Sequence, residues 1–329
     1  MIFLFKKNLF VNSLLLLPYT ILLRSSTLLY PFNAPDYTCS NIVVDTVVGV
    51  FHKPWVEPIF TILLVFFHAV AINWLVIKNK LSKSITLLPG MLYILIMSAC
   101  NAFLPLLPIL FANTFFILAL IQLFGLYKKI NSAPTYLLAG FFIAMASIFY
   151  LPYVLALFLG LYLIYTLQSI GLVEILQFLG GFISVAFVTS SILYFNGNAQ
   201  QFFTTELASN FSFPTVLFSA SLVEYLIVGA IVLLLVIFAW NFSRFEKKKS
   251  LPAKKKISAL FYWQLLSIIS LFLICDLNLY HILFLSVSSC IFASFFIVDA
   301  KTTVWYELVH LVCVGLILNS QFNFYTFNF

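Results

Sequence analysis

Charged side chains are scarce in this chain. Lys, Arg, Asp and Glu make up 8% of its 329 residues, whereas hydrophobic residues make up 63%. A soluble globular protein carries about 25% charged residues, so this composition excludes that class. Lipid cannot hydrogen-bond the backbone, so long apolar runs predict membrane-spanning helices. We therefore expect an all-α integral membrane protein, a polytopic bundle that forms one transmembrane domain over residues 1–329.

Cysteine pairs and catalytic motifs are also missing. The sequence contains five cysteines and no C-x-x-C pair. It has no H-E-x-x-H, Walker A, G-x-S-x-G or dinucleotide-binding pattern. We therefore expect no metal site and no disulfide framework.

The few basic residues fall in clumps between apolar runs. Cytoplasmic loops of membrane proteins collect Lys and Arg, so the clumps indicate one side of a bilayer. We expect these charges to set topology and to meet anionic membrane lipids, not nucleic acid. Only Arg24 and Lys53 fall elsewhere. The clumps are residues 6–7, 78–83, 128–129, 244–256 and Lys301.

The apolar runs between the clumps predict eleven spans, with a cytoplasmic N-terminus and the C-terminus on the opposite side of the membrane. Outer loops are expected at 31–56 and 197–214, a cytoplasmic interfacial segment at 169–177 and a basic cytoplasmic loop at 243–257. The predicted spans are 8–30, 57–77, 85–103, 107–127, 135–149, 152–167, 178–196, 216–241, 258–275, 279–297 and 303–320.

The uncharged segment 135–168 is too long for one ordinary span. A single crossing would place the basic loop 243–257 outside, whereas a hairpin broken at Pro152 keeps it inside. We therefore predict two short helices, and whether they cross fully or are re-entrant stays open.

Two groups of ionisable residues are candidates for function, because charges in or beside a membrane are costly to keep there. The outer group has Asp36 and Asp45 as candidate general bases, with Arg24, His52 and Lys53 as candidate ligands of a lipid phosphate. Ordinary loop charges are the alternative for each of them. The intramembrane polar candidates are His68, Glu224, Glu307 and His310. For His68, a hydrogen bond between helices is the expected role.

Residues 144–152, 1–6 and 73–80 resemble a family of uncharacterised, Phe-rich inner-membrane proteins of Gram-negative bacteria. The layout also looks like the membrane module of GT-C glycosyltransferases. That resemblance implies a polyprenyl-phosphate-linked sugar as donor and an acidic residue of the first outer loop as base. Asp36 would match that position best and Asp45 second.

Three functions follow as hypotheses. The first is GT-C-like transfer of a sugar from a polyprenyl-phosphate carrier at the periplasmic face. The second is a non-catalytic subunit or scaffold of a cell-envelope complex, with other inner-membrane proteins as partners. The third is a proton-coupled transporter, which requires His68 or the Glu307/His310 pair to face a cavity.

Overall fold

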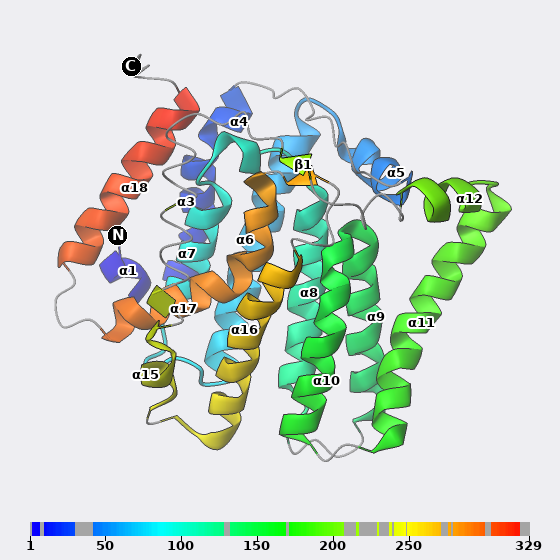
Figure 1. Cartoon of the computed structure of the whole chain (residues 1–329). Coiled ribbons are helices and arrows are strands. Elements are labelled where there is room, and N and C mark those ends of the chain that lie inside the picture. The colour runs from blue at the N-terminus through cyan, green and yellow to red at the C-terminus, as the bar shows by residue number, and fades with distance from the viewer. Residues whose placement is uncertain are drawn as a thin grey trace.

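The fold is a bundle of helices (Figure 1). The computed structural model describes residues 2–6, 10–29, 42–127, 132–168, 171–206, 215–216, 229, 237–238, 240–247, 249–270, 276–277, 279–299 and 304–322. Within these ranges the β-structure is limited to one parallel pair of two-residue strands, β1 (Thr215–Val216) and β2 (Asp276–Leu277). The predicted helical fold class is confirmed.

Four of the described helices are long and apolar enough to cross a membrane. They are α6 (Val56–Lys78), α11 (Leu172–Phe195), Leu279–Asp299, which joins η5 (Leu279–Leu285) to α17 (Ser286–Asp299), and α18 (Val304–Phe322). The other helices of the bundle core are α3 (Leu16–Leu23), α7 (Leu88–Met97), α8 (Pro108–Phe124), α9 (Ala133–Phe149), η2 (Leu151–Leu155), α10 (Ala156–Leu167) and α16 (Leu251–Ser270). The remaining described elements are α1 (Ile2–Lys6), α2 (Phe10–Leu14), α4 (Ser25–Leu29), α5 (Ile42–Phe51), η1 (Asn101–Phe103), α12 (Ala199–Gln201), η3 (Phe202–Glu206) and α15 (Phe242–Glu246).

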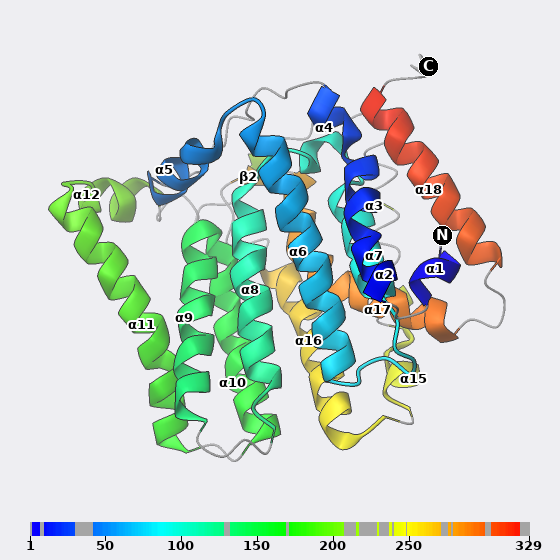
Figure 2. The same ribbon diagram turned by 180° about the vertical axis from the view of Figure 1, so that it is seen from behind.

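The central helices pack around one apolar core, and two helices stand on opposite flanks. Figures 1 and 2 place α18 along one edge and α11 along the other. The long helix α11 packs closely on α9. Glycines make this crossing possible, because a Cβ at Gly181 would lie 2.0 Å from the Leu137 carbonyl oxygen and one at Gly140 would lie 1.9 Å from that of Phe178. Small residues let helix backbones approach each other in this way.

Several predicted boundaries differ from the structure. Within the predicted span 8–30, helix α3 ends at Leu23, Arg24 caps it, and α4 begins at Ser25. The predicted outer loop 31–56 contains helix α5, whose Val44 and Val48 are buried one turn apart. The predicted boundary between segment 169–177 and the span 178–196 is absent, since α11 begins at Leu172 and continues without a break to Phe195.

The uncharged segment 135–168 forms two helices side by side (Figure 1). The helical structure is interrupted at Tyr150, whose backbone is extended with φ −151° and ψ 104°, and it resumes at Leu151. Pro152 lies in the first turn of the second helix, where its missing N–H costs nothing. The predicted span 216–241 lies largely outside the described residues.

The two ends of the bundle differ in charge. The C-terminal end of α6, the C-terminal end of α10 and the N-terminal end of α16 meet at one end, where Lys256 donates to Asn79 Oδ1 at 2.6 Å and Lys255 to the Thr166 carbonyl. We call this the lysine end; it is the lower end in Figure 1. The opposite end includes α4, α5 and α12.

Candidate functional site

The predicted outer group lies at the end opposite the lysine end. Asp45 is exposed in the first turn of α5, and the exposed His52 and Lys53 follow that helix. His52 Nδ1 lies 2.8 Å from Glu57 Oε2, and the Leu106 backbone N–H donates to Glu57 Oε1 at 3.1 Å. The carboxylate of Glu57 therefore ties α6 to the turn before α8. Asp36 lies outside the described residues.

Arg24, unlike that exposed group, is fully buried. Its Nη1 donates to the Leu104 carbonyl oxygen at 2.9 Å, and its Nη2 donates to those of Met97 at 2.6 Å and Phe103 at 3.0 Å. Carbonyls at the C-terminal end of a helix lack intrahelical partners and attract cations. Arg24 thus holds the break between α3 and α4 against the end of α7, and a phosphate would have to displace these contacts.

His68 lies between three helices in the bundle interior. Its Nδ1 is hydrogen-bonded to the Tyr93 hydroxyl of α7 at 2.9 Å, and its Nε2 to Thr114 Oγ1 of α8 at 2.7 Å. The side chain is 2% exposed. Both ring nitrogens are therefore used to join α6 to its neighbours.

The polar contacts continue from His68 across the bundle. Ser286 of α17 lies beside the Tyr93 hydroxyl and accepts from Asn113 Nδ2 at 3.5 Å. The Tyr153 hydroxyl of η2 donates to Asn113 Oδ1 at 2.5 Å. Together these residues form a buried polar network: His68, Tyr93, Asn113, Thr114, Tyr153 and Ser286.

A second buried contact set surrounds His281. Its Nδ1 is bonded to the Tyr150 hydroxyl, and its Nε2 to Ser270 Oγ at 3.1 Å. The rings of Tyr150 and Tyr153 are 6.2 Å apart, so this set adjoins the buried polar network. Tyr93, Asn113 and Tyr153 are not among the residues predicted from the sequence. Their only signal in the sequence is that each is an uncharged polar residue within an apolar run.

The pair predicted on α18 splits between two environments. His310 is buried, and its Nε2 is bonded to the Tyr19 hydroxyl of α3 at 2.9 Å. Glu307 is half-buried, one turn nearer the start of the helix. Glu224 lies outside the described residues.

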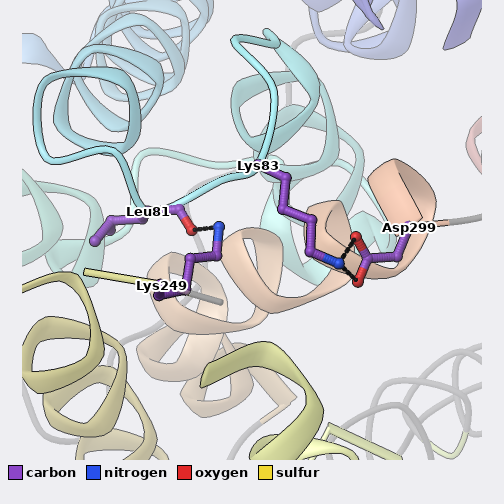
Figure 3. Close-up of polar contacts among 4 residues, drawn as sticks. All are labelled: Leu81, Lys83, Lys249 and Asp299. Carbon is purple, nitrogen blue, oxygen red and sulfur yellow. Dashed lines mark hydrogen bonds and ion pairs between the residues drawn. The ribbon is translucent and has the colours of Figure 1, made fainter. Parts of the chain in front are cut away.

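The lysine end contains a small pocket of about 10 Å³. Lys83 Nζ lies 2.7 Å from each carboxylate oxygen of Asp299, and Lys249 Nζ donates to the Leu81 carbonyl oxygen at 2.7 Å (Figure 3). Burial lowers the pKa of Lys249, the nearby Lys83 lowers it further, and Asp299 acts in the opposite sense. The basic loop is therefore attached to the end of the bundle through specific side chains.

These sites differ in the chemistry open to them. The interior histidines are enclosed by bonds between helices, whereas Asp45, His52 and Lys53 present a carboxylate and two basic groups to the surroundings. Among the described residues, no group of three His, Cys, Asp or Glu could hold a metal ion. No protein-family model, curated protein or solved structure matches this chain.

Proposed function

We propose that this chain is a multi-pass inner-membrane protein of about eleven spans that transfers a sugar from a polyprenyl-phosphate carrier at the periplasmic end of the bundle. The observation that supports this is the exposed group on and after α5. Asp45, His52 and Lys53 all lie at the end of the bundle opposite the lysine end. The positive-inside rule assigns the lysine end to the cytoplasm. The exposed group then meets the periplasm.

The proposed step is a displacement at the anomeric carbon. The carboxylate of Asp36 or Asp45 takes the proton of an acceptor hydroxyl. At the same time, the oxygen of that hydroxyl bonds to the anomeric carbon. The bond from the anomeric carbon to the phosphate oxygen breaks, and the carrier leaves as polyprenyl phosphate. His52 and Lys53 stabilise the charge that develops on this leaving group. Arg24 contributes indirectly, because its contacts to three carbonyls fix the break between α3 and α4.

The test uses the purified full chain in lipid nanodiscs with a short-chain polyprenyl-phosphate hexose. Release of the hexose to an added acceptor or to water is measured for Asp36→Asn, Asp45→Asn and the unaltered chain. Loss of the general base should lower the rate by about 100-fold or more in one of the two variants. Glu307→Gln removes a carboxylate on the flanking helix α18 and should leave the rate unchanged. Full activity in both Asn variants would exclude a carboxylate base in this loop.

A second candidate function is that of a non-catalytic membrane subunit, and the flanking helices favour it. In the most apolar stretch of each helix, only 17% of the residues of α11 and 11% of those of α18 are buried within the chain. Exposed side chains include Phe187 at 71% on α11 and Val312 at 58% on α18. Photo-crosslinking residues placed at these two positions should capture a partner protein in fixed stoichiometry. Crosslinks to lipid alone would argue against the subunit.

The transporter hypothesis gains no support from the interior contacts. Both ring nitrogens of His68 bond neighbouring helices, and His310 bonds Tyr19. These are the contacts expected of residues that join helices.

A further inference from the structure

The pocket at the lysine end is built from three separate parts of the chain. Ser82 and Lys83 come from the segment after α6, Lys249 precedes α16, and Asp299 ends α17. Figure 3 shows Lys83 pointing at Asp299 while Lys249 points at Leu81. Phenyl rings form the apolar part of its wall, contributed by Phe245 and Phe295.

The pocket has more hydrogen-bond donors than its described acceptors use. The Ser82 hydroxyl oxygen is buried and has no hydrogen-bond partner among the described residues. An ammonium group has three N–H donors, and the Leu81 carbonyl takes one of those on Lys249. Two lysines face one carboxylate here, so the local charge is positive. A buried donor without a partner costs free energy, and an oxygen anion bound in the pocket would remove that cost.

We propose that this pocket binds the phosphate group of an anionic membrane phospholipid. Lys249 and Ser82 donate to a phosphate oxygen, and Lys83 lies beside them, paired with the competing carboxylate of Asp299. A volume of about 10 Å³ admits about one water-sized group, so one phosphate oxygen enters and the rest of the head group stays at the surface.

The location of the pocket favours a lipid over free phosphate. Phe245 and Phe295 line the pocket but are only 3% and 5% exposed, so the glycerol and acyl chains stay outside with the rest of the head group. Basic pockets between helices on the cytoplasmic side bind lipid head groups in membrane proteins. This assignment does not depend on the proposed sugar transfer, since it concerns the other end of the bundle.

The experiment titrates the purified full chain, in phosphatidylcholine micelles, with phosphatidylglycerol and follows the thermal unfolding midpoint. The midpoint should rise with phosphatidylglycerol. For Lys249→Gln the half-saturating lipid fraction should increase about fivefold, the effect of one lysine near an anionic surface. Lys247→Gln is the matched control, because it removes the same charge from an exposed position in the same loop that does not line the pocket.

A second variant acts in the opposite direction. Asp299→Asn removes the competing carboxylate, so half-saturation should move to a lower lipid fraction, by about twofold or more. This result remains informative if Lys249→Gln does not fold. Weaker binding by Asp299→Asn, or equal responses to phosphatidylglycerol and phosphatidylcholine, would overturn the site. An equal response to inorganic phosphate would overturn the lipid assignment.

Discussion

Several buried polar side chains of the described residues join different helices. His68 contacts Tyr93 and Thr114, His310 contacts Tyr19, and Arg24 contacts backbone carbonyls. In an apolar interior the alternative to such a pair is an unsatisfied group. These side chains therefore fix which helices are neighbours, a task that nonspecific apolar packing performs poorly.

Removing one member of the buried polar network should destabilise the fold measurably. Tyr93→Phe keeps the ring but leaves His68 Nδ1 without its partner. We expect the free energy of unfolding to fall by about 1 kcal/mol. This is the size of the contribution of one side-chain hydrogen bond in soluble and membrane proteins. Chemical unfolding in mixed micelles measures it. Tyr165→Phe is the control, because Tyr165 is 69% exposed. Equal losses in the two variants would show that the Tyr93 hydroxyl contributes nothing.

The lowered pKa of Lys249 makes anionic lipid binding depend on pH. Burial and Lys83 lower this pKa, and Asp299 opposes the shift. A lysine is charged below its pKa, so binding should be complete at neutral pH and weaken as pH rises through the lowered value. The loss should occur below the ordinary lysine pKa of about 10.4. Phosphatidylglycerol titrations at increasing pH measure this. The profile of Lys249→Gln should lack the step, and a step at the same pH in that variant would assign it to another group.

At the scale of elements, apolar length and charge spacing predicted most helices, including the break between α9 and α10. The interruptions inside an apolar run were not predictable in the same way. The break at Arg24 depends on carbonyls about 80 residues further along the chain, and the helix α5 depends on burial of Val44 and Val48. The buried polar network could not be predicted from the sequence either, because its members come together only when the helices pack.

Adjacent glycines on α11 should respond in opposite ways to alanine. A Cβ at Gly181 would lie 2.0 Å from the Leu137 carbonyl oxygen, whereas one at Gly180 meets nothing within 4 Å. Gly181→Ala should therefore force α9 and α11 apart. We expect the free energy of unfolding to fall by about 2 kcal/mol, as for overpacked sites, and the unfolding midpoint to fall with it. Gly180→Ala should be neutral or stabilise by up to about 1 kcal/mol, because alanine favours the helix. Thermal unfolding of both variants decides, and a destabilised Gly180→Ala would point to the surroundings of this face of α11 instead of the crossing.

At the scale of the whole molecule, the bundle separates its charges between two ends. The lysine end is bound together by side chains that donate to carbonyls or to Asn79, as Lys249, Lys255 and Lys256 do. Lys53 is exposed at the other end. These contacts hold the basic loop at one end of the bundle. The orientation of the folded bundle in the membrane therefore decides on which side the loop lies.

The orientation of that unit in the membrane can be measured directly. In a background in which the five native cysteines are replaced, a membrane-impermeant thiol reagent should label Lys53→Cys in cells whose inner membrane is intact. It should label Lys247→Cys only after that membrane is opened, since cytoplasmic loops retain lysines. Both positions are exposed, so accessibility within the protein is matched. The reverse pattern would place Asp45 and His52 in the cytoplasm, where a polyprenyl-phosphate sugar on the outer leaflet could not reach them.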